Sequence, residues 1–476
     1  MIKIIITKNI LYFICIIFIL FSIDQNILDA YPAGWSDDIL LTPEDSDSRS
    51  YPDVDVDGLN KVWVVWDSAD IMNGTAEILY TKRDSLGGCI IPESTVSNNP
   101  TYSILPRLVV DGSNNVHFIW RDASPPGLGL WYAKLANDGS VIVPSHLVED
   151  GVCPLNAAPE VALNRNKELN IIWDEEPGSY NYMNYTKLDS MGNILIPKMQ
   201  VSPININSYY AGLAVDSLGN VHMGYRTNYT SIESLTYTKV DKNGNILISN
   251  KILDSGVAPS IVADPFLNIH MVYCHRSDSG WDINYLKLDT AGQIIITPKS
   301  LSIDLNNMIP HMAIDSLHYL HIVWYMVVPM GIMYTKMDLS GSFIIPPMLV
   351  VNPPQAYWPG NPRIAVDRSN RLHLVWEDQR FGANDIFYKR GDNDQSIGES
   401  GINQPISSNL SCSPNPFTSF ARIPGYEKED FNIMDITGRV VGKYKGARVG
   451  ENLPAGVYFI ISQNKKISPG RIVKIK

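Results

Sequence analysis

A motif that returns seven times, at a pitch of about 50 residues, constrains this chain most strongly. Each copy contains an apolar stretch, usually after a proline, then an Asp or Asn and a short turn. A strand ending in Trp or Tyr follows, and then a strand carrying Tyr-x-Lys or Tyr-x-Arg. The closing aromatic residues are Trp66, Trp120, Trp173, Tyr225, Tyr273, Trp324 and Trp376. Self-similarity at a fixed period indicates a repeat architecture, so most of the chain is expected to be scaffold.

Each copy predicts four antiparallel strands. The first is expected to begin after a proline, where the missing N–H is harmless; these positions are Pro52, Pro106, Pro159, Pro259, Pro310 and Pro362, with Ala211 in the fourth copy. In the third strand, Tyr and Lys two residues apart share one face. We expect the Lys stem to lie along apolar surface with its charge in water. Four-stranded units of this length predict an all-β propeller of seven blades, with an open solenoid as the competitor.

The order of the termini favours a closed ring. The seventh copy stops at Arg390 and lacks a fourth strand, while the segment Asp38 to Pro43 resembles fourth strands such as Ile344-Ile345-Pro346. We therefore predict a propeller over residues 31–390 in which residues about 37–43 complete the last blade. Pairing this edge would close the ring, which a solenoid does not require.

An Asp and a His stand six residues apart in five copies. The pairs are Asp111 with His117, Asp216 with His222, Asp264 with His270, Asp315 with His321, and Asp367 with His373. The first copy has Asp57 and Trp63 instead, and the third has Asn164 and Asn170; both are expected to share a hydrogen bond across the turn. Because each blade directs its His differently, a buried, carboxylate-held imidazole is favoured over a metal site.

No cofactor or metal is expected. The run Asp53-Val54-Asp55-Val56-Asp57-Gly58 imitates the start of a calcium loop, but its twelfth position is Val64 rather than a bidentate Glu. In repeat register it is the first strand of the first blade.

Charge and the N-terminus bear on partners and location. The net charge is −11, and residues 411–476 carry 11 Lys and Arg against 5 Asp and Glu. The remainder is therefore strongly acidic, which argues against nucleic acid as a partner. Lys3 and Lys8 precede an apolar run from Ile10 to Ile23, which predicts a signal peptide over residues 1–30. A single N-terminal membrane anchor is the alternative.

The C-terminal region carries three short blocks in order, after a polar stretch at 391–410 that predicts a linker. They are Ser413-Pro414-Asn415-Pro416-Phe417, Asp435-Ile436-Thr437-Gly438-Arg439-Val440, and Leu453-Pro454-Ala455-Gly456-Val457-Tyr458. Residues about 411–476 thereby resemble the C-terminal sorting domain of the type IX secretion system. The resemblance implies a small β-sandwich, the secretion machinery as partner, and a secreted or cell-surface protein of a Gram-negative bacterium, exported across the outer membrane.

The repeats also resemble secreted propellers of the BNR or sialidase-like form, most closely from Trp376 to Tyr388. The Ser-x-Asp-x-Gly-x-x-Trp turns of sialidases are missing, so the resemblance implies no catalytic residue. Two functions stay open. One is a non-catalytic module that binds glycan or protein, which is preferred, and the other is a sialidase-like glycoside hydrolase or lyase acting on extracellular polysaccharide. A pure structural spacer is a third.

Candidate ligand residues lie where the second strands lead into the third, because these links vary freely among the repeats. Carboxylate pairs there suit glycoside hydrolysis, and aromatic rings suit stacking on a sugar. The candidates are Asp67, Arg121, Asp122, Asp174, Glu175, Arg226, His275, Arg276, Trp281, Glu377, Asp378 and Arg380. Solvated turn residues are the plainer interpretation of the same pattern.

Overall fold

A computed structural model describes residues 34–43, 47–70, 74–97, 102–123, 128–151, 158–228, 233–277, 280–302, 306–328, 330–353, 358–392, 418–422, 430–434, 440–445, 448–462 and 470–474. The expected signal peptide, most of the expected linker, and the sorting-motif residues Pro414, Asn415, Pro416, Asp435, Gly438 and Arg439 lie outside this range. The chain divides into two compact units, Met1–Ser400 and Gly401–Lys476, and each is described by itself. No helix long and apolar enough to span a bilayer occurs within the described ranges.

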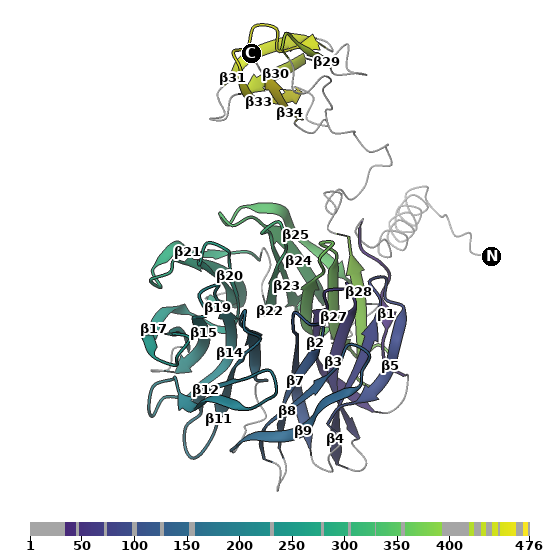
Figure 1. Ribbon diagram of the computed structural model, residues 1–476, viewed down its shortest axis with the longest axis vertical. Coiled ribbons are helices and arrows are strands. Elements are labelled where there is room, and N and C mark those ends of the chain that lie inside the picture. The colour runs from purple at the N-terminus through teal and green to yellow at the C-terminus, as the bar shows by residue number, and fades with distance from the viewer. Residues whose placement is uncertain are drawn as a thin grey trace, which may run out of the picture. The chain divides into compact units, whose positions relative to one another are not determined.

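The first unit is a seven-bladed β-propeller, as the repeats predict (Figure 1). Each blade is a four-stranded antiparallel sheet, and six of them take their strands in chain order. These six are β2 (Ser48–Val56), β3 (Val62–Asp70), β4 (Thr75–Arg83) and β5 (Cys89–Thr95); β6 (Ser103–Val110), β7 (Val116–Asp122), β8 (Gly129–Leu135) and β9 (Val141–Asp150); β10 (Glu160–Leu163), β11 (Leu169–Glu175), β12 (Tyr182–Leu188) and β13 (Ile194–Gln200); β14 (Ser208–Val215), β15 (Val221–Asn228), β16 (Glu233–Val240) and β17 (Ile246–Ser255); β18 (Val257–Ala263), β19 (Ile269–Ser277), β20 (Gly280–Leu288) and β21 (Ile294–Ser300); β22 (Asn307–Ile314), β23 (Leu320–Met326), β24 (Gly331–Met337) and β25 (Phe343–Val351).

The seventh blade joins the two ends of the propeller. Its strands are β26 (Gly360–Val366), β27 (Leu372–Asp378), β28 (Asp385–Gly391) and β1 (Ile39–Leu40). Ile39 pairs with Tyr388, and Trp35 forms a further bridge with Gly391. In Figure 1 the purple β1 accordingly lies beside the green β28. The ring is closed, so the solenoid alternative is wrong.

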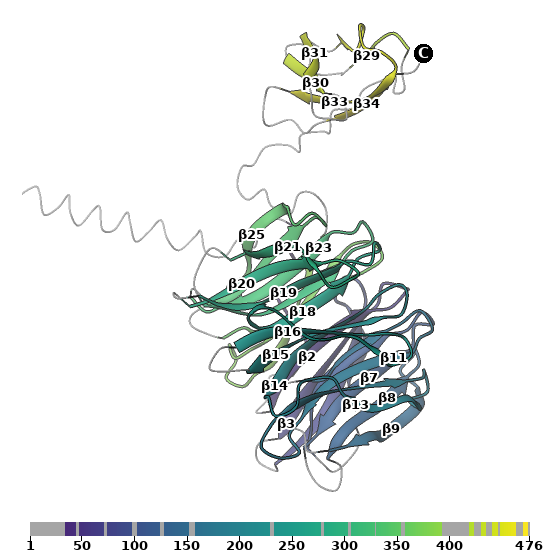
Figure 2. The same cartoon turned by 90° about the vertical axis from the view of Figure 1, so that its left-hand side faces the viewer.

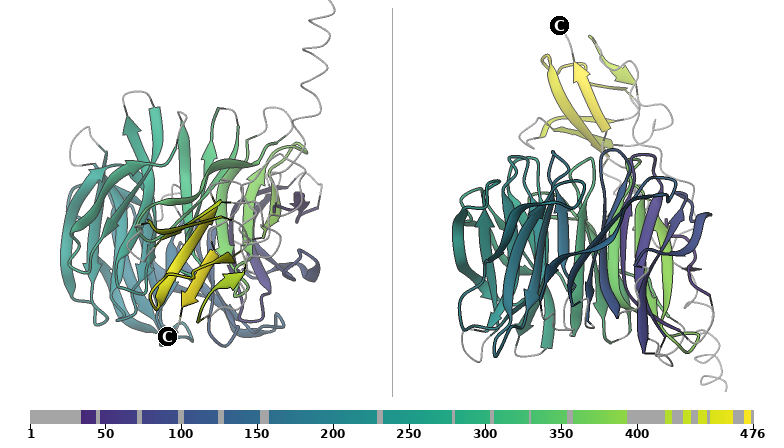
Figure 3. Two further views of the ribbon diagram at one scale, coloured as in Figure 1. Left: turned by 90° about the horizontal axis from the view of Figure 1, so that it is seen from above. Right: turned by 60° about the horizontal axis from the view of Figure 1, so that its bottom comes forward.

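The first strand of each blade lines the inside of the ring. Neighbouring first strands contact one another all the way round, with β26 contacting β2. Figure 2 shows two of these strands, β14 and β18, running side by side within the unit. Views from two further directions show the blades standing next to one another as upright sheets (Figure 3).

Apolar side chains are packed between the blades, because every blade is a sheet with a neighbouring blade against each of its two faces. A hydrophobic cluster lies at each of the seven seams. The seven closing aromatic residues are all buried, and each is a member of one of these clusters. The repeated Trp or Tyr is therefore a core residue, as the repeat pattern indicates.

Pro159 directly precedes β10, as expected, but the other prolines of the first strands do not stand at strand starts. Pro52 lies inside β2, where the register with β3 shifts between Ser50 and Asp53. The same shift surrounds Pro106, Pro259, Pro310, Pro362 and the equivalent Ala211. A bulge leaves one residue unpaired, so a proline there removes no ladder hydrogen bond.

The second unit contains a four-stranded sheet and a two-stranded one. The larger sheet has the order β31 (Val440–Lys445), β30 (Asp430–Met434), β33 (Gly456–Ser462) and β34 (Gly470–Lys474). The smaller pairs β29 (Ala421–Arg422) with β32 (Arg448–Val449). Pro454 and Gly456 of the expected sorting motif stand at the start of β33, and the hydroxyl of Tyr458 donates to the carbonyl of Pro454 at 2.9 Å.

Candidate functional site

The five Asp–His pairs lie inside the blades. The distances from His Nε2 to Asp Oδ2 run from 3.1 Å in His270–Asp264 and His321–Asp315 to 3.5 Å in His373–Asp367. The other ring nitrogen, Nδ1, is 2.7–2.9 Å from the hydroxyl of the Tyr in the third strand. All five imidazoles are buried, and burial lowers their pKa, to about 4 in His117 and His270. All five are therefore neutral at pH 7 and accept from Tyr, and four of them donate to Asp; Nε2 of His373, at 3.5 Å, is too far from Asp367 for a hydrogen bond.

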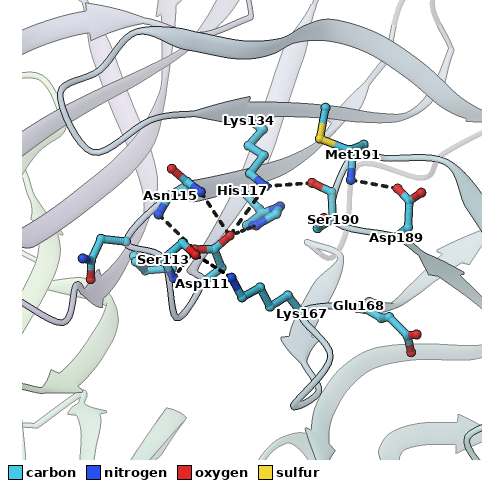
Figure 4. Close-up of polar contacts among 12 residues, drawn as sticks. Asp111, Ser113, Asn115, His117, Lys134, Lys167, Glu168, Asp189, Ser190 and Met191 are labelled. Atoms are coloured by element: carbon cyan, nitrogen blue, oxygen red, sulfur yellow. Dashed lines mark hydrogen bonds and ion pairs between the residues drawn. The ribbon is translucent and has the colours of Figure 1, made fainter.

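The Lys of Tyr-x-Lys ties this network to the next blade, rather than reaching into water as expected. Lys134 is 4% exposed, lies 3.5 Å from Asp111, and donates to the carbonyl of Ser190 in the following blade at 2.9 Å. Figure 4 shows His117 and Lys134 converging on Asp111 while Lys134 extends to Ser190. The turn of Ser190 also packs closely, because a Cβ on Gly192 (φ +84°) would lie 2.5 Å from Tyr132.

The two substituted copies behave differently from the prediction. Asn170 accepts a hydrogen bond from Tyr185 at 2.8 Å, but Asn164 binds Glu168 instead of Asn170. In the first copy, the indole nitrogen of Trp63 is buried without a hydrogen-bond partner among the described residues. The predicted bond across the turn is therefore wrong in both copies.

A cavity of about 500 Å³ lies on the axis of the ring, lined by residues from the first strands of all seven blades. Ligand sites in proteins commonly fall in this size range. One position recurs around its wall, namely the residue that follows the proline or its equivalent. This inner ring consists of Asp53, Arg107, Glu160, Gly212, Ser260, His311 and Arg363. Blade symmetry thus directs six polar side chains toward one space.

Glu160 bridges two arginines across the cavity. Its Oε1 lies 3.0 Å from Nε of Arg107 in the preceding blade and 2.9 Å from Nη2 of Arg363, which belongs to the seventh blade. Burial alone would raise the pKa of Glu160, but Arg363 and Arg107 outweigh it and hold that pKa below its usual value. The bridge fixes both guanidinium groups at the cavity wall.

The remaining polar members of the inner ring hold the neighbouring blade. Asp53 Oδ2 accepts the amide of Leu108 at 3.0 Å, and Ser260 Oγ accepts that of Met312 at 3.0 Å. His311 Nδ1 accepts the amide of Ile364 at 3.1 Å, so its proton is on Nε2, which is available to a ligand. Burial, with Arg363 and Arg107 nearby, lowers the pKa of His311 well below its usual value.

The bulge residues form a second tier at one rim of the cavity. Six non-glycine residues that precede the proline or Ala211 have positive φ, from 47° to 58°; they are Tyr51, Leu105, Tyr210, Ala258, Ile309 and Asn361. Such a conformation costs about 1–3 kcal/mol per residue and persists only where the surroundings impose it. Tyr51, Tyr210, Ala258, Ile309 and Asn361 line the cavity.

Side chains at the ends of the second strands accept hydrogen bonds from the backbone of these bulge residues. Glu377 accepts hydrogen bonds from the amide of Tyr51 at 2.8 Å and from the side chain of Asn361 at 2.9 Å. Asp67 accepts the amide of Leu105 at 2.9 Å, and Cys274 occupies the same position beneath Ile309. Burial raises the pKa of Glu377 to about 7 and that of Asp67 to about 8.

Of the twelve residues expected to contact a ligand, the structure places Trp281 at the cavity wall and Asp67 and Glu377 behind its rim. Four others are buried at seams on the second and third blades. Arg121 pairs with Asp174 at 2.8 Å, Asp122 accepts from Ser103 at 3.2 Å, and Glu175 accepts the indole N–H of Trp173 at 2.9 Å. These contacts make the four side chains part of the framework.

The other five lie at the ends of blades. Arg226 pairs with Glu233, and His275 lies 3.3 Å from Asp254. Arg276 is exposed beside Trp281. Asp378 and Arg380 form an ion pair, and Arg380 also binds Asp38 at 2.8 Å. Asp378 and Arg380 thus secure the closure of the ring.

The inner ring is the part of the site that the sequence analysis missed. A usable signal was present, because aligning the repeats at the proline places Asp, Arg, Glu, Ser, His or Arg at one position of an otherwise apolar strand. No cluster of His, Cys, Asp and Glu that could hold a metal ion occurs in the part of the chain described here.

Comparison with known proteins places the chain by fold alone. No family model matches it, and no curated protein does. A protein of unknown function from Dyadobacter fermentans is similar at 11% identity, with a TM-score of 0.50, over 75% of this chain and 99% of the other.

Two enzymes are also similar in fold. A fungal alcohol oxidase in complex with copper has 11% identity and a TM-score of 0.52, over 93% of this chain and 99% of its own. A Hadza microbial sialidase has 10% identity and a TM-score of 0.42, over 72% and 65%. At these identities the activities of the relatives do not carry over. The chain is a seven-bladed β-propeller, and the comparisons show no more than this fold.

Proposed function

We propose that this chain is a secreted or cell-surface propeller that binds a glycan in its axial cavity without cleaving it. The observation that carries the proposal is the mixture of groups on the cavity wall. Two guanidinium groups, three carboxylates, an imidazole and a hydroxyl share it with the rings of Tyr51, Tyr210 and Trp281. Alternating donors and acceptors suit sugar hydroxyls, and aromatic rings suit the apolar faces of a pyranose.

The size and charge of the site favour a glycan over other ligands. A stable protein interface buries about 800 Å² on each partner, whereas the polar groups here converge on one small hollow. The positive charges of Arg107 and Arg363 are offset by Glu160, Asp53 and Asp55 in the same cavity. A ligand rich in hydroxyl groups fits this balance better than a multiply charged one.

A binding role is favoured because the carboxylates at the cavity are already committed. Glu160 holds two arginines, while Asp53 and Asp55 accept the backbone amides of Leu108 and Val110. A glycosidase needs one carboxyl group free to transfer a proton and a second free to act as base or nucleophile.

One observation favours the hydrolase or lyase alternative. Asp55 lines the cavity, and burial raises its pKa to about 6, the range in which a carboxyl group can act as an acid near neutral pH. Turnover of a chromogenic glycoside by the full chain, abolished in Asp55→Asn, would establish this alternative.

A glycan array and a chromogenic glycoside panel, both run on the full chain, test the proposal. The expected result is binding of a restricted set of glycans with no turnover. Arg363→Met should remove the binding, while Arg368→Met, a surface control on the next turn, should retain it. Absence of binding to any glycan would contradict the proposal.

Export by a type IX-like machinery, recognising residues about 411–476, completes the proposal. The supporting observations are the three motif blocks in order and the small all-β unit that follows the propeller. The test is a type IX-competent bacterium expressing the chain with and without residues 411–476. Surface or medium localisation should require that segment, and export without it would overturn this part.

A further inference from the structure

The rim of the axial cavity differs from one side to the other. On the seventh and first blades, Glu377 and Asp67 fasten the rim backbone, and the half-buried Arg380 pairs with both Asp38 and Asp378. On the fourth blade the equivalent position is Arg226, and on the fifth blade Arg276 stands two residues beyond it; each arginine lies beside an aromatic ring. A ligand that extends out of the cavity would therefore meet different side chains on these two sides of the rim.

The fourth blade presents an arginine and two tyrosines. The guanidinium of Arg226 lies over the ring of Tyr209, 4.9 Å from its centroid, and Glu233 holds that guanidinium from the other side. Tyr209 meets Tyr210 edge to face at 5.9 Å. Tyr210 is 37% exposed and also lines the cavity, so the aromatic surface continues from the cavity wall onto the end of the blade.

The fifth blade repeats the arrangement with different strands. Arg276 at the end of β19 is paired in register with Trp281 at the start of β20, and its guanidinium is 5.8 Å from the indole centroid. Trp281 lines the cavity while Arg276 is exposed. An arginine that flanks an aromatic ring holds it in place and adds donors at its edge.

We infer that the bound glycan is the end of a polysaccharide chain that leaves the axial cavity over the fourth and fifth blades, with sugar rings stacked on Tyr210 and Trp281. This inference rests on the proposed function. Stacked aromatic rings flanked by donors suit successive pyranoses, which alternate apolar faces with hydroxyl edges. The ligand class is therefore an oligo- or polysaccharide, and a free monosaccharide would use only the cavity.

Chain-length dependence is the direct consequence. Each sugar added beyond the cavity gains contact with the aromatic surface until Tyr210 and Trp281 are covered. Affinity is expected to rise about tenfold or more from one sugar to four, which corresponds to about 1.4 kcal/mol or more from the added contacts with Tyr210 and Trp281. Beyond that length the affinity should level off.

The experiment uses the full chain and size series, from one to eight sugars, of homogalacturonan, alginate, xylan and galactan fragments on one array. Wild type should favour the longer members of whichever series it binds. Trp281→Ala and Tyr210→Ala should lose that preference, reducing affinity for long members about tenfold more than affinity for the monosaccharide. Trp281→Phe should retain most of the preference, because it keeps an aromatic face.

Two further variants separate stacking from loss of folding. Phe381→Ala removes an exposed ring from the seventh blade and should not alter the length preference. Arg276→Ala changes only an exposed side chain and should weaken long members without lowering the melting temperature.

The failures of the two claims are distinguishable. Binding by wild type that is equal for all lengths, or a length preference that survives Trp281→Ala and Tyr210→Ala, would overturn the inference while the proposed function stands. Binding of none of the series together with no binding on the wider glycan array, or capture of proteins only, would overturn both.

Discussion

The carboxylate of Asp38 lies 2.8 Å from the ammonium group of Lys389, joining the start of the described chain to the last strand of the propeller. Lys389 is fully buried, and burial lowers its pKa to about 8 although Asp38 acts to raise it. Asp38 also binds Arg380, and the amide of Asp392 donates to the carbonyl of Gly34 at 2.7 Å. The closure of the ring therefore depends on buried charge as well as on β1.

Asp38→Asn is expected to destabilise the propeller by about 3–5 kcal/mol, because removing one partner leaves a buried ammonium group without its countercharge. The measurement is the free energy of unfolding in urea. Asp37→Asn, one residue away and exposed, is the matched control. Deleting residues 31–44 should lower the melting temperature further, and an unchanged melting temperature would contradict the closure.

Asp315→Ala should cost about 1–3 kcal/mol, because it leaves the buried Nε2 of His321 without its acceptor. Asp138→Ala, at an exposed turn, serves as control and should cost less. Chemical denaturation of both variants checks this. Equal stability of Asp315→Ala and wild type would mean that the Asp–His pairs contribute nothing to the framework.

Glu377→Gln should become progressively more stable than wild type as the pH rises from about 5 to 8. The pKa of Glu377 is about 7 in the folded protein and ordinary when unfolded, so the folded state binds the extra proton between these values. Stability from this group is lost as the pH rises, by up to about 3 kcal/mol above pH 7. Gln keeps an oxygen for Tyr51 without a charge. Melting curves at several pH values measure the difference, and a pH-independent difference would contradict it.

Glu160→Gln should weaken glycan binding about tenfold, because Arg107 and Arg363 lose the shared charge that orients them. Glu168→Gln, in the same blade but outside the axial cavity, is the control. Titration of the array-selected glycan gives both affinities. Unchanged affinity in Glu160→Gln would contradict the axial cavity as the glycan-binding site.

The fold was predictable because seven copies repeat one pattern, and the incomplete seventh copy points to a strand from the other end. Details that depend on the neighbouring blade were not. The two-residue period of a strand predicts that Tyr132 and Lys134 share a face. It does not predict that the turn at Ser190 covers Lys134. Likewise, Pro52 marks a special strand position, but only the pairing of β2 with β3 reveals a bulge.

The candidate site was harder to predict than the fold. The variable links drew attention to Arg121 and Asp174, which neutralise each other at a seam. Arg107 and Glu160 belong to first strands, which the repeat pattern predicts to be scaffold. Only the closed ring brings them together with Arg363, which follows Glu160 by 203 residues. Trp281 is a predicted ligand residue that does lie at the cavity wall, because an aromatic residue near a blade end suits a sugar whatever the exact geometry.

The most direct measurement is a crystal structure of the full chain with the longest glycan that it binds on the array. The account predicts a sugar in the axial cavity, hydrogen-bonded to Arg107 or Arg363, with the next sugars on Tyr210 and Trp281. A glycan bound elsewhere, with the axial cavity holding only water, would contradict it.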